Sequence, residues 1–294
     1  MRVFVTGASG WIGSAVVPEL INAGHSVLGL ARSDASAAKL EQAGADVHRG
    51  SLEDLDALRA GATAADAVVH LAYIHDFTRM ADAAAADRAA IDALGAALAH
   101  TGKPLAIASG VAGFAPGTVV TERDLPAPGA YERGDNQRRA LALADRGVRV
   151  SVVRLPPTVH GAGDPGFVAT LVRIARETGV SGYIGDGANR WCAVHRLDAA
   201  RVFRLAIETA PAGAVLHAIA EEAVPTRAIA EAIGRGLDLP VEPRPPAHFD
   251  WLGFFFGMDA PASSAGTREL LGWAPQQPGL LADLEHYFTA ATPA

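Results

Sequence analysis

Short apolar runs alternate along the first 155 residues with stretches in which apolar residues return every three or four positions. The apolar runs predict buried strands at 3–5, 26–30, 47–48, 67–71, 105–109 and 148–154. The intervening stretches predict helices, a first one that begins near Ile12 and stops at Gly24, and others at 35–43, 54–60, 81–100 and 132–146. Strands that alternate with helices form a parallel sheet covered on both faces, so the pattern predicts an α/β fold.

The alternation of predicted strands and helices becomes less regular after Arg154, where prolines and glycines cluster in PPTVHGAGDPG and GDGANRW. Helices are predicted at 167–177, 198–208 and 226–237, with Asp198 as the cap of the second, and a strand at 215–220. An aromatic cluster, HFDWLGFFFG, and two terminal helices complete the chain. We expect one compact body, with a core at residues 1–155 and a smaller lobe built mainly from residues 156–294, some segments of which return to the core.

Composition and charge argue against nucleic-acid binding, disulfide bonds and membrane association. Of the 294 residues, 25 are Lys or Arg and 32 are Asp or Glu, and the net charge of −7 argues against a nucleic-acid partner. The single cysteine, Cys192, cannot form an internal disulfide, which fits a reducing compartment. The sequence has no evident signal peptide and no apolar span of about 18 residues, so we expect a cytoplasmic protein without a membrane partner. No metal site is expected.

Three glycines stand between the first apolar run and the first amphipathic stretch. Glycine allows a tight turn and lets main-chain atoms approach a pyrophosphate, while the start of the helix offers unpaired N–H groups to the anion. The arrangement predicts a dinucleotide site; the alternative is an ordinary strand–helix turn. The residues expected to hold the cofactor at this turn are Gly7, Ser9, Gly10, Trp11, Ile12 and Gly13.

The spacing G-x-x-G-x-x-G in VTGASGWIGSAVVPEL resembles that of the extended short-chain dehydrogenase/reductase family, which contains sugar-nucleotide epimerases and dihydroflavonol reductases. Four more segments resemble family motifs, in the family's order: GSLEDLDAL, VVHLA, SVVRLPPTVHGAGD and RWCAVHRLDAAR. The resemblance implies a Rossmann fold, a doubly wound parallel sheet that binds NAD(P), and a C-terminal lobe that closes over substrate. It also implies cofactor contacts at Ser51, Leu52, Leu71, Ala72, Pro156 and Val159.

The end of the second predicted strand bears on the form of the cofactor. An NAD site usually has an acid about 20 residues past the glycines, on the ribose 2′-hydroxyl. Here the strand ends in Arg32 and Ser33, and Asp34 fits better as a helix cap. Because a guanidinium pairs with a 2′-phosphate and stacks on adenine, we expect NADP(H). The alternative is that Arg32 is a solvated surface charge.

Reductases of this family use a Tyr-x-x-x-Lys pair and a Ser or Thr at the end of the fifth strand. Ser109 matches the serine, but the tyrosine and lysine positions fall near Gly129 and Arg133, and the only tyrosine nearby, Tyr131, comes two residues late. In one interpretation Tyr131 donates a proton to a carbonyl oxygen while Arg133 supplies the positive field. In a second interpretation Tyr131 has no chemical role. In a third the proton comes from His75, His160, Ser109 or water.

The substrate pocket is expected to form around the segment YIHDF, through Tyr73, His75 and Phe77. His160 stands where the family has a tyrosine near the nicotinamide, and Trp191 is expected to face the cleft or brace it. The aromatic cluster at 249–256 is either lobe core or an apolar substrate wall. Because few fixed charges are available for a nucleotide-sugar diphosphate, we expect a small, rather apolar carbonyl substrate.

The sequence therefore favours an NADPH-dependent oxidoreductase that reduces a carbonyl group. The missing Tyr-x-x-x-Lys pair leaves open an NADP(H)-binding regulatory protein without turnover, similar to the NmrA-like regulators, or an isomerase or lyase on the same scaffold. The helix at 81–100 and the helix after Tyr131 indicate a homodimer, unless they are plain surface helices.

Overall fold

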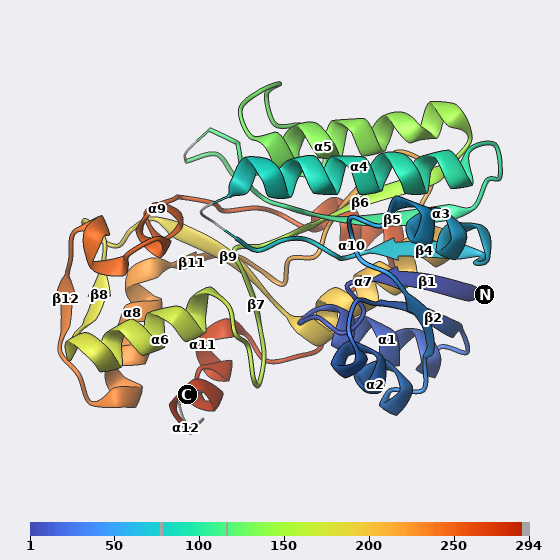
Figure 1. Cartoon of the computed structure of the whole chain (residues 1–294). Helices are drawn as coiled ribbons and strands as arrows, with labels where there is room; N and C mark the ends of the chain where they lie inside the picture. The colour runs from blue at the N-terminus through green and yellow to red at the C-terminus, as the bar shows by residue number, and fades with distance from the viewer. Residues whose placement is uncertain (77–78, 116, 290–294) are drawn as a thin grey trace.

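Seven strands form the central sheet of the structure, a computed structural model that describes residues 1–76, 79–115 and 117–289 (Figure 1). Their order across the sheet is β10-β6-β5-β4-β1-β2-β3, and every neighbouring pair is parallel. The strands are β1 (Arg2–Thr6), β2 (Ser26–Ala31), β3 (Asp46–Arg49), β4 (Ala67–His70), β5 (Pro104–Gly110), β6 (Arg149–Leu155) and β10 (Ala214–His217). The chain direction across the sheet reverses beside β1, where ligands of open α/β sheets bind.

Helices cover both faces of this sheet, which confirms the predicted doubly wound Rossmann fold (Figure 1). One face carries α1 (Gly13–Asn22), α2 (Asp34–Gln42) and α7 (Arg196–Thr209). The other carries α3 (Leu55–Thr63), α4 (Met80–Leu98) and α5 (Glu132–Leu141). Alternate strand residues divide between the two cores, since Val3 and Val5 belong to the first and Phe4 to the second. Within the described ranges, no helix is long and apolar enough to span a membrane.

Two elements of this half differ from the sequence prediction. The α-helix α5 ends at Leu141 and continues as a 3-10 helix, η1 (Ala142–Arg146), which Gly147 terminates with a φ of +71°. Asp198 is not the cap of α7, because the helix begins two residues earlier and the His195 ring accepts from the Leu197 N–H. The wholly buried Asp198 carboxylate instead accepts from the main-chain N–H groups of Gln276 and Gln277.

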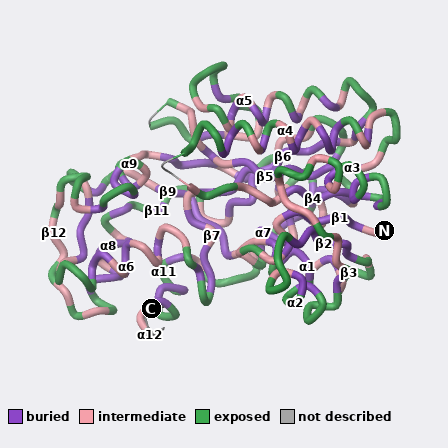
Figure 2. Tube along the Cα trace, in the orientation of Figure 1, coloured by how far each residue is buried: buried purple, intermediate pink, exposed green. Residues whose placement is uncertain are grey.

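The C-terminal half adds a smaller lobe with two small sheets, ordered β11-β9-β7 and β12-β8. Its strands are β7 (Thr158–His160), β8 (Ser181–Tyr183), β9 (Arg190–His195), β11 (Glu221–Pro225) and β12 (Val241–Pro243). Its helices are α6 (Phe167–Thr178), α8 (Thr226–Leu237), η2 (Pro246–Phe249), α9 (Leu252–Phe256), α11 (Leu280–Asp283) and α12 (Glu285–Thr289), whereas α10 (Ala265–Leu271) returns to the sheet beside β10. Figure 2 shows buried residues along the strands and exposed residues on the outer helix faces.

Part of the aromatic cluster is lobe core, one of the two roles that its sequence left open, and part of it is exposed. Phe249 and Phe256 are fully buried in the lobe core, where their rings meet at 4.9 Å. Trp251 and Phe254 remain exposed, Phe254 at 73% of its surface. Within α9, Phe256 therefore anchors the lobe while Phe254 presents an aromatic ring to solvent.

A buried arginine joins β6 to the neighbouring segments. Arg154 has no exposed surface and donates to Gln137 Oε1 at 3.1 Å, to two main-chain carbonyls in the 121–124 turn and to His217 Nε2 at 3.0 Å. The other ring nitrogen of His217 then donates to the carbonyl of Ser263 at 2.6 Å. Burial lowers the pKa of His217 to about 4, and the Arg154 charge adds to the effect while Glu122 opposes it.

We expect this histidine to make stability depend on pH. The unfolded chain binds a proton at His217 near pH 6.5 and the folded chain only near pH 4, so stability is complete above pH 6.5 and falls as the pH drops towards 4. Between pH 7 and 4.5 the loss from this residue is about 2–3 kcal/mol. Urea unfolding of the wild type and of His217→Gln at several pH values checks this, and equal pH slopes for the two proteins would contradict it.

Candidate active site

The three glycines lie at the point where β1 passes into α1, and contacts at two of them exclude a side chain. Gly7 has a φ of +65°, and a Cβ there would lie 2.7 Å from the main-chain nitrogen of Ala72. A Cβ on Gly13 would lie 2.1 Å from the Gly7 carbonyl oxygen. At Gly7 the main chain of the turn therefore packs directly against the main chain that follows β4, and at Gly13 the helix packs against the turn itself.

Unpaired main-chain donors face outward from this turn. The Gly10 N–H donates to the Gly7 carbonyl at 2.9 Å, but no described residue accepts from the N–H groups of Trp11, Ile12 or Gly13. These groups lie at the N-terminus of α1, where the helix dipole is positive. Three free donors, together with glycines that admit close approach, fit the pyrophosphate of a dinucleotide.

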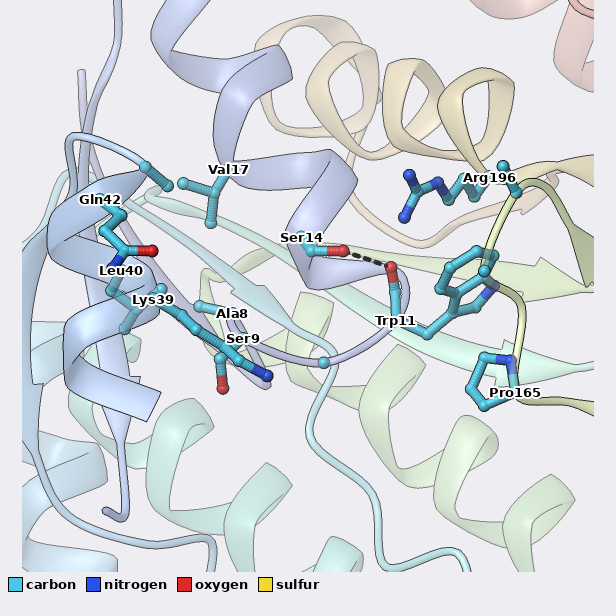
Figure 3. Close-up of a pocket in the computed structure, with 14 residues that line it drawn as sticks. Ala8, Ser9, Trp11, Ser14, Val17, Lys39, Leu40, Gln42, Pro165 and Arg196 are labelled. Carbon is cyan, nitrogen blue, oxygen red and sulfur yellow. Dashed lines mark hydrogen bonds between the residues drawn. The ribbon is translucent and has the colours of Figure 1, made fainter. Parts of the chain in front are cut away.

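A pocket of about 510 Å³ adjoins the turn and is lined by Ala8, Ser9, Gly10, Trp11, α2 residues, the 162–165 segment and Arg196 (Figure 3). Lys39 reaches from α2 towards Ser9, and Arg196 stacks over the Trp11 indole at 4.3 Å. Lys39 is not among the residues predicted from the sequence. The sequence offers one indication that Lys39 lies near the cofactor, its position seven residues after Arg32. That indication is weak, because a lysine on a helix normally lies on a solvated surface.

The other cofactor candidates lie at the carboxyl edge of the sheet. Arg32 directly follows β2 and is exposed, and it has no hydrogen-bond or ion-pair partner among the described residues. Ser33 caps α2 by accepting from the Ser36 N–H at 3.2 Å, and Asp34 pairs with Arg49 at 2.8 Å. Ser51 and Leu52 are partly buried after β3, Leu71 and Ala72 follow β4, and Pro156 and Val159 follow β6.

A buried polar chain fixes the end of β4. The Thr6 hydroxyl accepts from the N–H groups of Leu71 and Ala72 and thus has one hydrogen left to donate, to His70 Nδ1 at 2.8 Å. The Nε2–H of His70 then faces Asp87 Oδ1 at 3.3 Å. Although burial raises the pKa of Asp87, hydrogen bonds from His70 and Asn136 hold it below its usual value. The sequence analysis missed this chain, because its members come from β1, β4 and two helices.

Two of the three catalytic candidates come together at the end of β5. Ser109 is 4% exposed and donates to Gln137 Oε1 at 3.4 Å. Arg133, from α5, donates through Nη2 to the Ala108 carbonyl at 3.3 Å, while its buried Nε has no partner among the described residues. Its guanidinium lies 4.1 Å from the centroid of the Tyr73 ring. The site therefore has a hydroxyl, a cation and a phenol within one small region.

Tyr131 occupies the residue just before α5 and is partly buried. The Cβ of Tyr131 packs against Gly113, since a Cβ added to Gly113 would lie only 3.0 Å from it. Tyr131 is near enough to Tyr73 to influence its ionisation. Burial raises the pKa of the Tyr73 phenol above its usual value, and the charge of Arg133 opposes that rise.

The candidates for substrate contact are distributed differently from the prediction. Tyr73 is partly buried and meets the exposed His75 ring at 5.3 Å, whereas Phe77 lies outside the described residues. His160 is wholly buried, with Nδ1 2.8 Å from Asp283 Oδ2. Trp191 is also wholly buried and donates to the Phe255 carbonyl. Neither has surface to offer a substrate, because packing against the lobe core covers both.

Over the parts of the chain that the structure describes, no cluster of His, Cys, Asp or Glu is placed to hold a metal ion.

The family model described as the NAD dependent epimerase/dehydratase family matches residues 3–219. The uncharacterized protein YLL056C of Saccharomyces cerevisiae is 45% identical over 291 residues, which cover 97% of this chain and 98% of that protein. The 2-alkyl-3-oxoalkanoate reductase of Stenotrophomonas maltophilia is 30% identical over 226 residues, which cover 73% and 67%.

Similar solved structures include MoeE5 in complex with UDP-glucose and NAD, with a TM-score of 0.77, 23% identity and coverage of 98% of this chain and 97% of that one. The UDP-glucose 4-epimerase of Thermotoga maritima has a TM-score of 0.76 at 19% identity, with coverage of 98% and 97%. These structures support the fold, and the family match spans the motifs quoted from the sequence. The chain belongs to the NAD-dependent epimerase/dehydratase family of extended short-chain dehydrogenases/reductases.

Proposed function

We propose that the protein is an NADPH-dependent reductase of a carbonyl group in a small, rather apolar compound. The observation that carries the proposal is the combination of free amides in the turn after β1 with Ser109 and Arg133 at the end of β5, two strands away in the same sheet. The name of the Stenotrophomonas relative, a reductase of an oxoalkanoate, supports a carbonyl substrate. When bound, the cofactor supplies a hydride to the carbonyl carbon.

The charges around the turn support the phosphorylated cofactor. The N–H groups of residues 11–13 would hold the pyrophosphate, and Arg32 has a free guanidinium next to β2. Lys39 adds a second cation beside Ser9, and Asp34, which follows Ser33, is paired with Arg49. A 2′-phosphate would gain charge-assisted contacts with two cations here.

The reacting end of the site offers donors for a carbonyl oxygen. Ser109 presents a hydroxyl at the end of β5, and Arg133 brings a permanent positive charge near a tyrosine. The exposed rings of Trp251 and Phe254 support an apolar substrate more than a sugar diphosphate. The pair formed by α4 and α5, which pack together on the outside of the sheet, supports a homodimer.

A binding protein without turnover is the second candidate. It is favoured by Gly129, which occupies the family's tyrosine position in an exposed turn. Such a protein would bind NADP⁺ and NADPH with similar affinity and oxidise neither, as expected for an NmrA-like regulator. An isomerase or lyase would instead convert its substrate without net consumption of NADPH.

Calorimetry checks the choice of cofactor. We expect Arg32→Ala and Lys39→Ala each to raise the Kd for NADPH by about 10–100-fold, because each removes one charge-assisted contact with the 2′-phosphate. The Kd for NADH should rise much less in both variants, because NADH lacks the 2′-phosphate and keeps only the contacts with adenine and pyrophosphate. Arg59→Ala, an exposed cation paired with Asp56 on α3, is the control and should change neither value. Tighter binding of NADH than of NADPH by the wild type would contradict the proposal.

Turnover is checked by NADPH absorbance with a panel of apolar aldehydes, ketones and 2-alkyl-3-oxoalkanoate esters. We expect oxidation of NADPH by at least one of them, and a loss of about 10²–10³-fold in kcat for Ser109→Ala, because a donor to the developing oxyanion is removed. NADPH binding should persist in this variant. Binding by the wild type without oxidation across the panel would favour the regulatory candidate.

A further inference from the structure

The tyrosine position of the family holds no side chain in this protein. Gly129 is exposed with a φ of +72°, and its N–H donates to Asp135 Oδ1 at 3.1 Å. That bond closes the turn ahead of α5 and places no phenol at this position. A reductase built on this scaffold needs a proton donor from another element.

Arg133, near the family's lysine position, contacts a tyrosine from another element, the segment that follows β4. Its guanidinium covers the ring of Tyr73 at 4.1 Å, and its Nη2 donates to the carbonyl of Ala108, the residue before Ser109. Arg133 thus connects the end of β5 with the segment that follows β4. We propose that Tyr73 donates the proton to the substrate oxygen and that Arg133, stacked on its ring, holds the charge left behind. The inference rests on the proposed carbonyl reduction.

The phenol of Tyr73 is available for this role. Its oxygen forms no hydrogen bond with any residue that the structure describes, and the side chain is only partly buried. Two other tyrosines are engaged in the lobe, since Tyr287 donates to Asp164 Oδ2 at 2.7 Å and the buried Tyr183 packs beneath Arg227 at 5.3 Å. Neither lies at the end of β4 or β5.

Tyr131 is the remaining tyrosine and the direct competitor. Its side chain begins against Gly113 and its ring passes Gly134, which holds it along the loop side of α5. Across the described ranges, no cation lies over the Tyr131 ring, whereas Arg133 lies over that of Tyr73. Of these two tyrosines, Tyr73 is therefore the one with a stacked cation, which favours the phenolate that proton donation creates.

The surroundings of Tyr73 keep its phenol protonated before the reaction, as a proton donor requires. Burial raises the pKa of Tyr73, Arg133 lowers it, and the net value stays above the usual one, so the phenol keeps its proton at neutral pH. A guanidinium remains charged throughout this range and favours the phenolate once it forms. The other titratable groups that face Tyr73 are Tyr131, Glu132 on α5, Asp87 on α4 and His75 in the same segment.

The proposed step balances without a further reactant. The hydride of the reduced cofactor forms the new C–H bond at the carbonyl carbon while the π pair of the carbonyl moves to oxygen. The O–H bond of Tyr73 breaks and its proton joins that oxygen, so the carbonyl is reduced to an alcohol and NADPH is oxidised to NADP⁺. The Tyr73 phenolate lies against Arg133 until it takes a proton from water.

Phenylalanine substitutions test the assignment, with ethyl 2-methyl-3-oxobutanoate and the carbonyl panel as probes. We expect Tyr73→Phe to lower kcat by at least about 100-fold with little change in the Kd for NADPH, because only the acid is lost. Tyr183→Phe, a tyrosine that also lies under an arginine, is the matched control and should keep its activity. Full turnover in Tyr73→Phe, or a comparable loss confined to Tyr131→Phe, overturns the inference.

A second measurement needs no turnover. With 3,5-difluorotyrosine in place of Tyr73, ionisation near neutral pH is followed by ¹⁹F NMR in the protein without cofactor. We expect the midpoint to rise by about one pH unit or more in Arg133→Gln and to be restored in Arg133→Lys. An unchanged midpoint in Arg133→Gln overturns the pairing.

The two failures are distinguishable. A wild-type protein that oxidises no NADPH with any probe refutes the proposed reaction, and the inference falls with it. Turnover that survives in Tyr73→Phe refutes the inference alone.

Discussion

Main-chain atoms of the glycine turn lie closer to the end of β4 than any side chain would allow, and the rest of the site is arranged around that contact. A Cβ on Gly7 would meet the nitrogen of Ala72, and one on Gly13 would meet the Gly7 carbonyl. The same approach brings the Thr6 hydroxyl to two N–H groups after β4 and leaves its hydrogen for His70. The turn, the strand end and α4 thus form one hydrogen-bonded unit from which the segment that begins with Tyr73 emerges.

Arg133, which lies near the position predicted for the family's lysine, makes two contacts that depend on the shape of its side chain. A guanidinium is flat and carries donors along its edge, so it can cover an aromatic ring with its face while an edge N–H meets a carbonyl. Arg133 does both, with Tyr73 below it and Ala108 beside it. An ammonium group is a point charge and would satisfy one of these contacts at a time. The residue at this position therefore suits a phenol supplied from β4 better than one supplied from its own helix.

Local patterns were enough to predict the sheet, the glycine turn and the helices around them. Apolar runs and helical spacing are properties of neighbouring residues, and all seven strands of the central sheet, including that near 215–220, were predicted. The lobe strands were missed because segments such as SGY and VEP are too short to show alternation and gain their order from distant partners. Lys39, His70 and Asp87 were missed for a related reason. Each appears ordinary in its own element and acquires a role only from residues that the fold brings to it, as does Asp198 with Gln276 and Gln277.

The Trp11 indole gives the lobe a fixed point on the core. Its Nε1–H donates to the Val159 carbonyl at 2.7 Å, and Arg196 covers its ring. One residue of the phosphate-facing turn is thereby bonded to the segment that leads into the lobe. A displacement of this segment away from the turn would break this bond, because the indole belongs to the turn and its acceptor belongs to the segment that leads into the lobe.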